Sequence, residues 1–124
     1  MLQKKKCILF IISSEYEHLG CWTDKSSHAV PSIEGSDPRI QGQYRNRQDA
    51  INKCFAVARD QEMKVFAIKD TGMCGASKDM NGYKKYGKAG NCKNGVGAPW
   101  VNDVYRILHP ILHGGMNFYF CLYQ

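Results

Sequence analysis

The sequence predicts a small α+β fold in which one helix packs on a small curled antiparallel sheet, pinned by two disulfides and carrying long Gly-rich loops. Three patterns predict it: one helical stripe of apolar residues, two short stretches with strand-like alternation, and four cysteines inside this patterned region. With 124 residues the chain holds one domain at most, and its core is marginal without covalent help.

The helix is expected over Arg45–Met63. Its apolar residues fall at positions i, i+3, i+4 and i+7 and form one stripe, made of Ile51, Cys54, Phe55 and Ala58. Asn46 is expected to be the N-cap, with Asp49 three residues later near the positive end of the helix dipole. Because the stripe contains Cys54, this cysteine should face the sheet.

A short strand is expected within Lys64–Cys74, where Val65, Ala67 and Lys69 lie on one side and Phe66, Ile68 and Asp70 on the other. It should break at Gly72 and enter a loop, with Cys74 at the strand end. The closing strand is expected over Trp100–Leu108, and at most one short strand is expected around Ala29–Ile33.

Six cysteines without a C-x-x-C motif, in a chain this short, favour an oxidising compartment. Cys54 on the buried helix face and Cys74 at the end of the following strand are natural partners. Cys92 then bonds most simply to Cys21, the remaining framework cysteine. A bond between Cys21 and Cys54 is the alternative that would overturn both assignments.

The two ends of the chain differ from its middle. Residues 1–14 are expected to be a signal remnant or a disordered N-terminus, with a short N-terminal strand as the alternative. Residues 15–109 are expected to form the disulfide-stabilised module, and residues 110–124 a C-terminal tail outside it. The module could stand alone or belong to a longer multidomain repeat protein.

Net charge argues against nucleic-acid binding. The formal charge is +6, from 17 Lys and Arg against 11 Asp and Glu, and three of the lysines are the run Lys4–Lys6. The remaining excess is ordinary for a soluble domain, whereas nucleic-acid binding usually needs a denser basic face. No stretch approaches the roughly 20 apolar residues of a membrane-spanning helix, so no membrane span is expected.

Motifs for catalysis or cofactors are weak. His109 and His113 have the helical spacing of two metal ligands, but Pro110 lies between them, so no metal site is expected. His18 and His28 flank Cys21 with the loose spacing of a nucleophile pair, which a disulfide at Cys21 would exclude. The Gly-rich loop lacks the phosphate-binding motifs. We therefore expect no enzymatic activity and no cofactor.

A basic aromatic loop is the best candidate for a recognition surface. Tyrosine rings can stack on sugars or contact proteins, and lysines can pair with sulfate, carboxylate or phosphate. The expected ligand-binding residues come from this loop and the closing strand: Tyr83, Lys84, Lys85, Tyr86, Lys88, Trp100, Asn102 and Asp103. The alternative is a solvated loop whose lysines serve only solubility.

A family resemblance covers roughly Leu19–Ile107. It rests on the order GCWTD, AINKCFAVA, KVFAIKDTGMC, YKKYG, NCKNG and PWVNDVYRI. This order resembles the small cysteine-pinned modules of secreted and cell-surface proteins of marine invertebrates, similar to the WSC and PAN/apple groups. Such kinship implies carbohydrate or protein binding outside the cell and no catalysis.

The expected function is accordingly a non-enzymatic extracellular recognition or adhesion module whose partner is a glycan or an extracellular protein. The alternative is a small basic secreted effector that acts on membranes or as an antimicrobial protein, which the positive charge permits.

Overall fold

A computed structural model describes residues 5–11, 15–108 and 117–123. The chain divides into two compact units, of which Tyr16–Ile107 is the larger. In the smaller unit, β1 (Lys5–Ile11) pairs antiparallel with β6 (Asn117–Tyr123), and the register sets Cys7 opposite Cys121. The interpretation of residues 1–14 as a signal remnant and of 110–124 as a tail outside the domain stays a prediction. His109 and His113 lie outside the described residues.

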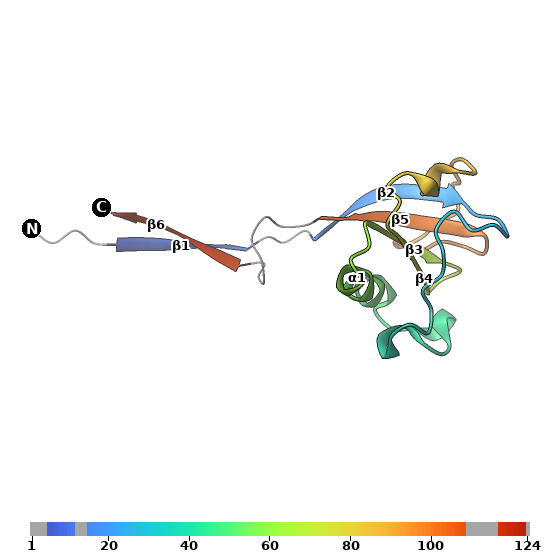
Figure 1. The fold of residues 1–124 in the computed structure, drawn as a ribbon, viewed down its shortest axis with the longest axis horizontal. Helices are drawn as coiled ribbons and strands as arrows, with labels where there is room; N and C mark the ends of the chain where they lie inside the picture. The colour runs from blue at the N-terminus through green and yellow to red at the C-terminus, as the bar shows by residue number, and fades with distance from the viewer. Residues whose placement is uncertain (1–4, 12–14, 109–116, 124) are drawn as a thin grey trace, which may run out of the picture. The chain divides into compact units, whose positions relative to one another are not determined.

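The larger unit is a small α+β fold, as predicted, with one α-helix in the described part of the chain (Figure 1). Its open antiparallel sheet has the order β2-β5-β3-β4. The strands are β2 (Tyr16–Thr23), β3 (Val65–Lys69), β4 (Met73–Ser77) and β5 (Val101–Ile107). The helix is α1 (Ala50–Asp60), and three short 3-10 helices accompany it: η1 (Pro38–Ile40), η2 (Tyr44–Asn46) and η3 (Gly82–Lys84).

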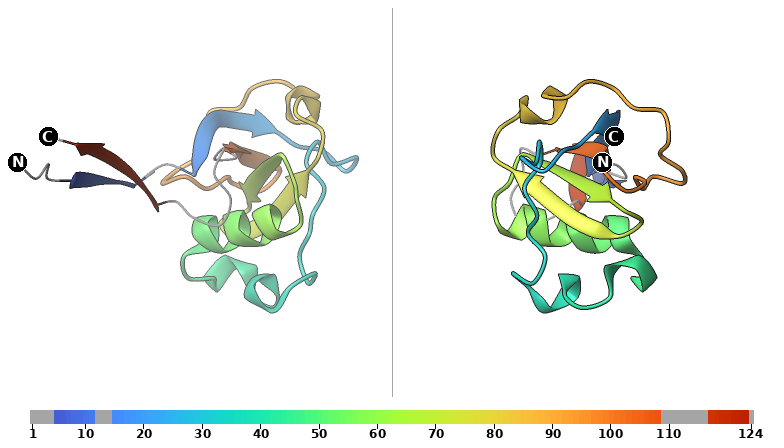
Figure 2. Two further views of the ribbon diagram at one scale, coloured as in Figure 1. Left: turned by 60° about the vertical axis from the view of Figure 1, so that its left-hand side comes forward. Right: turned by 90° about the vertical axis from the view of Figure 1, so that its right-hand side faces the viewer.

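The helix covers one face of the sheet (Figures 1 and 2). Because side chains alternate along a strand, Phe66 and Ile68 point to this face and pack with Phe55 and Val57 of the helix. Tyr16, Phe66 and Tyr105 form a cluster of ring contacts in the same core, with centroids 4.9–5.4 Å apart. Segments after β2 and after β4 cover the opposite face, where Val30 and Tyr83 pack on Ala67 and Val104.

Both predicted disulfides are present: Cys54 bonds Cys74, and Cys21 bonds Cys92. The first joins the buried face of α1 to β4, and both of its cysteines are fully buried. The second joins β2 to the Gly-rich loop. These two bonds tie the helix and the longest loop to the sheet.

The predicted start of the helix is wrong. Asn46 belongs to η2, and α1 begins at Ala50 after Asp49, whose left-handed backbone (φ 54°) separates the two helices. Asp49 makes no side-chain capping bond to the backbone, and its carboxylate accepts a hydrogen bond from the Asn52 side chain at 2.9 Å. The polar residues before Ala50 are compatible with a helix in sequence, but the backbone at Asp49 interrupts it, so α1 starts later than predicted.

The single strand predicted over Lys64–Cys74 is a hairpin. β3 ends at Lys69, a turn follows, and Cys74 is the second residue of β4 rather than the end of β3. The turn residues Asp70 and Thr71 both have positive φ values, 47° and 77°. Such turns normally carry Asn-Gly or Asp-Gly, so Asp-Thr-Gly is a weak signal for a hairpin. Ala29–Ile33 contributes only an isolated bridge, between Ser32 and Gly75.

None of the helices described is both long enough and apolar enough to cross a membrane.

Candidate functional site

The most unusual surface residue is Trp100, at the start of β5. It is 54 % exposed and has a φ of 58°. The Val101 N–H donates to the Ala98 carbonyl at 3.1 Å, so Ala98–Val101 is a tight turn with Pro99 second and Trp100 third. A positive φ at the third position is typical of glycine, and a bulky side chain there costs about 1–3 kcal/mol. The turn therefore holds a large aromatic ring out from the protein in a strained conformation.

The end of the β3–β4 hairpin supports this turn. Gly97 donates to the Ile68 carbonyl at 2.8 Å, and the Thr71 and Asp70 N–H groups donate to the carbonyls of Gly97 and Ala98 at 2.8 and 3.1 Å. A Cβ atom on Gly97 would lie 1.9 Å from the Val101 carbonyl oxygen, so only glycine fits. The Trp100 turn and the hairpin thus form one rigid edge.

A largely buried acid–base cluster lies next to Trp100. The Asp24 side chain is fully buried and accepts hydrogen bonds from Lys69 Nζ at 2.8 Å and from the Ala29 N–H at 2.8 Å. His28 Nδ1 is 2.8 Å from the same carboxylate and 3.0 Å from Lys69 Nζ. Burial by itself raises the pKa of Asp24, but hydrogen bonds from Lys69, Ala29 and His28 outweigh it and lower the pKa below its usual value.

This cluster positions the aromatic ring. The His28 ring lies nearly parallel to the Trp100 ring, with an interplanar angle of 13° and centroids 6.1 Å apart. Lys69 Nζ lies 5.6 Å from the centroid of Trp100, and the Asp24 N–H donates to the Trp100 carbonyl at 2.9 Å. The Trp100 ring therefore contacts a cation and a nearly parallel imidazole, and its carbonyl is bonded to the backbone of Asp24.

The opposite wall is a network around Asp70. Its Oδ2 atom accepts from Arg45 Nη2 at 2.6 Å and from the Tyr44 hydroxyl at 2.9 Å. The hydrogen bond from Arg45 lowers the pKa of Asp70, and the hydrogen bond to Asp70 raises the pKa of Tyr44. At neutral pH this wall therefore presents a carboxylate, a guanidinium and a neutral phenol.

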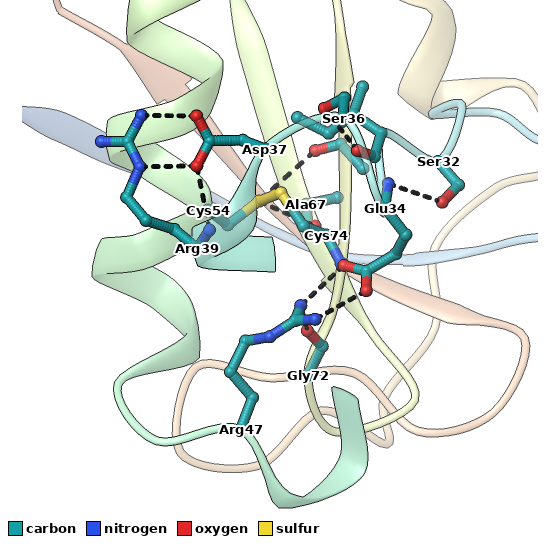
Figure 3. A network of polar contacts seen from close by, with 12 residues as sticks. Ser32, Glu34, Ser36, Asp37, Arg39, Arg47, Cys54, Ala67, Gly72 and Cys74 are labelled. Carbon is teal, nitrogen blue, oxygen red and sulfur yellow. Dashed lines mark hydrogen bonds and ion pairs between the residues drawn. A yellow bond between two sulfur atoms is a disulfide. The ribbon is translucent and has the colours of Figure 1, made fainter. Parts of the chain in front are cut away.

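A buried ion pair fixes this wall to the hairpin (Figure 3). Arg47, whose side chain is 4 % exposed, forms a two-pronged pair with Glu34 at 2.6 and 2.7 Å and donates to the Gly72 carbonyl at 2.9 Å. Glu34 also accepts from the Cys74 N–H at 2.8 Å. A Cβ atom on Gly72 would lie 2.0 Å from the Tyr44 carbonyl oxygen, so the hairpin packs directly on the segment that carries Tyr44.

Between the two walls lies a groove of about 420 Å³. Its lining combines one exposed aromatic ring with hydrogen-bond donors and acceptors: His28, Ser32, Tyr44, Arg45, Lys69, Asp70, Met73, Pro99 and Trp100. Small-ligand sites typically combine an apolar contact surface with a few fixed polar groups. The groove has this composition. Arg45 pairs with Asp70 on one wall, and Lys69 on the other wall pairs with Asp24, which is buried behind the lining.

The structure separates the predicted ligand residues of the closing strand. Trp100 lines the groove, whereas Asn102 and Asp103 are each only 2 % exposed, because β5 is an inner strand with β2 on one side and β3 on the other. Asp103 accepts from His18 Nε2 at 2.5 Å. Asn102 pairs in register with Lys69, and its Nδ2 atom has no hydrogen-bond partner. The expectation that the whole Trp100–Asp103 segment lines the surface is therefore corrected to Trp100 alone.

The residues of the predicted basic loop also differ in exposure. Tyr83 is 7 % exposed and packs edge-on against Trp22 with ring centroids 5.1 Å apart, so it belongs to the core rather than to a ligand surface. Lys84, Lys85 and Lys88 are exposed, and Tyr86 is half-buried. The Tyr86 hydroxyl donates to the Ser27 carbonyl, which attaches this loop to the segment that carries His28.

Most residues that line the groove, or support it from behind as Asp24 does, were not predicted as ligand-binding residues from the sequence: Asp24, His28, Tyr44, Arg45, Lys69 and Asp70. One signal was available, because Lys69 ends an otherwise apolar strand and a buried lysine needs an acidic partner. The sequence does not name that partner, which lies 45 residues away.

A second depression, of about 510 Å³, lies beside the Cys21–Cys92 disulfide and includes His18, Asp103 and Tyr105. No aromatic ring is held out beside it as Trp100 is beside the groove, and Cys21 is bonded, so a nucleophile pair of Cys21 with His18 is excluded. Among the residues described, no three His, Cys, Asp or Glu side chains are grouped so that they could hold a metal ion.

Comparisons with known proteins found no family model and no curated protein that matches this chain. The similarity to WSC and PAN/apple modules stays a prediction from the residues.

Proposed function

We propose that residues 16–107 form a non-enzymatic extracellular recognition module, and that the groove beside Trp100 binds a sugar residue of a carbohydrate. The observation that carries the proposal is the exposed Trp100 ring, held at a strained backbone position over a polar groove. Strained residues that persist in folded proteins cluster at functional sites. Trp100 contacts His28 and Lys69, yet about half of it stays exposed, so these contacts bury little of the ring and a role in binding is the most direct explanation of the strain.

The chemistry of the groove matches a sugar. A pyranose ring has an apolar face of C–H bonds, which can lie on an indole ring, and hydroxyl groups around its edge that both donate and accept. Arg45 and Asp70 lie side by side on the opposite wall, so neighbouring hydroxyls would meet a donor and an acceptor together. Both groups are ionised, and hydrogen bonds to ionised groups are the stronger ones.

The extracellular location rests on the two disulfides. Such bonds form and persist in oxidising compartments and are rare in the cytosol. A secreted module that binds sugars needs no catalytic group, and the ion pairs at the groove, Arg45 with Asp70 and Lys69 with Asp24, suit hydrogen bonding to hydroxyl groups.

The test is the substitution Trp100→Gly. Glycine accepts a positive φ without strain, so the melting temperature should stay within about 5 °C of the wild type. Loss of an aromatic anchor should weaken binding by at least about thirtyfold. A glycan array identifies a ligand, and calorimetric titration then compares wild type with variant. Met80→Gly, which removes an exposed apolar side chain outside the groove, is the matched control and should bind as the wild type.

Two results would overturn the proposal. One is an array on which the intact protein binds no glycan, charged or neutral. The other is wild-type affinity in Trp100→Gly. If the protein instead causes leakage of liposomes while it binds no glycan, the alternative of a basic membrane-active effector replaces the proposal.

A further inference from the structure

The arginines and a group of lysines differ in how their charges are compensated. All five arginines form ion pairs with carboxylates, including Arg45 with Asp70 and Arg47 with Glu34. Several described lysines, Lys64 and Lys78 among them, have no ion pair with a carboxylate. Four of these unpaired lysines, Lys25, Lys84, Lys85 and Lys88, also lie over aromatic rings. We call these four residues the lysine patch. Its charge is available to an external anion.

Aromatic rings hold the lysine patch in place without neutralising it. Lys25 and Lys85 each lie 5.1 Å from the centroid of Tyr86, Lys84 lies 5.5 Å from that of Tyr83, and Lys88 lies 5.8 Å from that of Trp22. A cation over a ring is attracted to it but keeps its full charge. The four ammonium groups are therefore arranged on a fixed aromatic support, unlike lysines on a mobile loop.

The backbone beneath the patch is anchored to β2. The Thr23 N–H donates to the Gly87 carbonyl at 2.9 Å, and the Thr23 hydroxyl donates to the Lys88 carbonyl at 3.3 Å. Lys85 Nζ also donates to the Ser27 hydroxyl at 3.3 Å. The patch is thus built on a hydrogen-bonded frame.

The segment Asp24–His28 belongs to both the patch and the groove. It contributes Lys25 to the patch, and Ser27 accepts hydrogen bonds from Lys85 and Tyr86. The same segment contributes His28 to the groove wall and Asp24 to the cluster next to Trp100. A ligand that leaves the groove across this short segment reaches the lysines directly.

The groove and the lysine patch differ in net charge, so they suit different parts of a ligand. In the groove, Arg45 is paired with Asp70 and Lys69 with Asp24, so these pairs leave no excess charge and favour an uncharged ring. The patch has only positive charges. We propose that the ligand is an acidic polysaccharide, with one sugar ring on Trp100 and the sulfate or carboxylate groups of neighbouring sugars on the lysine patch. This inference rests on the proposed function of the groove.

The experiment measures binding of the full-length protein to immobilised heparin, which has sulfate and carboxylate groups, to hyaluronan, which has carboxylates only, and to uncharged dextran. The test variant is Lys84→Gln with Lys85→Gln. The control is Lys64→Gln with Lys78→Gln, which removes the same charge from exposed lysines next to the opposite end of the β3–β4 hairpin. Melting curves confirm that each variant is folded.

The salt dependence of binding distinguishes attraction by the lysine charges from direct contact with Trp100. Raising the salt concentration from about 0.05 M to about 0.5 M shortens the Debye length from about 14 Å to about 4 Å. The test variant should bind an acidic chain about tenfold more weakly at low salt and within about twofold of the wild type at high salt. The control should stay within about twofold at both salt concentrations, and Trp100→Gly should weaken binding at both. Binding to heparin but not hyaluronan identifies sulfate as the anion, and binding to both identifies carboxylate as sufficient.

Several outcomes would overturn the inference. Equal weakening by the test and control variants would show unspecific attraction to a positive protein. Equal or tighter binding to phosphatidylserine vesicles or to a single-stranded oligonucleotide through the same lysines would assign the patch to a membrane or a nucleic acid. If Trp100→Gly abolishes sugar binding while the lysine variant does not weaken it, the inference fails and the proposed function stands. If the lysine variant weakens binding and Trp100→Gly does not, the proposed function of the groove fails, and this inference fails with it.

Discussion

Asp24 connects several of the segments that form the groove. Its carboxylate accepts from Lys69 on β3 and from the Ala29 backbone, and its N–H donates to Trp100 before β5. Removing one member of a buried ion pair leaves the other charged and unsolvated, which costs about 3–5 kcal/mol. The position of Trp100 and the stability of the fold therefore depend on the same residue, the first through its N–H and the second through its carboxylate.

Protonation of Asp24 should destabilise the protein in acid. Its pKa is lower in the folded protein than the usual value of about 3.9, so its stabilising contribution is complete above about pH 4 and is lost as the pH falls through the folded pKa. The pKa of Asp70 is also lowered, chiefly because of its hydrogen bond from Arg45. The free energy of unfolding in urea should thus be nearly constant from about pH 7 to pH 5 and fall below about pH 4.

The substitution Asp24→Asn separates Asp24 from the other acids. At pH 7 it should lower the free energy of unfolding by about 3–5 kcal/mol, because Lys69 stays buried without its partner. The decline of stability in acid should also become smaller. Adding Lys69→Met should recover part of the loss. Wild-type stability of Asp24→Asn at pH 7 would contradict the role of this ion pair.

At the scale of elements, the wall of the groove is held by contacts between segments rather than by a helix or strand of its own. Tyr44 and Arg45 lie in the short η2, and the pair of Arg47 with Glu34 ties this region to the β3–β4 turn (Figure 3). Glu34 also accepts from Cys74, which the disulfide bonds to α1. One ion pair and one disulfide therefore join the turn, the loop and the helix.

Arg47→Met tests this link. The change should lower the free energy of unfolding by about 3 kcal/mol, because Glu34 is left with an uncompensated, largely buried charge. Arg39→Met is the control, since Arg39 pairs with Asp37 and Asp60 at an exposed site and should cost at most about 1 kcal/mol. Chemical denaturation measures both variants. Equal effects of the two substitutions would show that the buried pair has no special role.

At the scale of the whole molecule, Tyr16–Ile107 is compact in itself. Two disulfides close stretches with sequence separations of 20 and 71 residues, which the chain-entropy model values at about 3 and 4 kcal/mol. Domains of this size typically have only 5–15 kcal/mol of total stability, so the two bonds form a large part of it. The unit should thus fold without the segments on either side.

A shortened chain of residues 15–108 tests this independence. It should unfold cooperatively, with a melting temperature within about 5 °C of the full chain, because the sheet, α1 and both disulfides lie inside it. Calorimetry provides the comparison. A much lower melting temperature would show that the neighbouring strands β1 and β6 contribute to the stability of the larger unit.

The sequence by itself determined the features that depend on local periodicity. The apolar stripe through Cys54 and Phe55 predicted a helix that faces the sheet, and the alternation from Val65 to Lys69 predicted a strand. Together these two patterns identified the partner of Cys54, and Cys21–Cys92 followed as the remaining pair. Such patterns are readable because side chains repeat every 3.6 residues in a helix and every 2 in a strand.

Only the tertiary structure decided which polar residues form the groove. Asp24, Lys69 and Trp100 come from three separate segments, and no spacing in the sequence connects them. The order of strands also decided that Asn102 and Asp103 are buried, although they follow the exposed Trp100 directly. The physical reason is that burial and ion pairing depend on which strands become neighbours, and this is set by packing across the whole chain rather than by any local pattern.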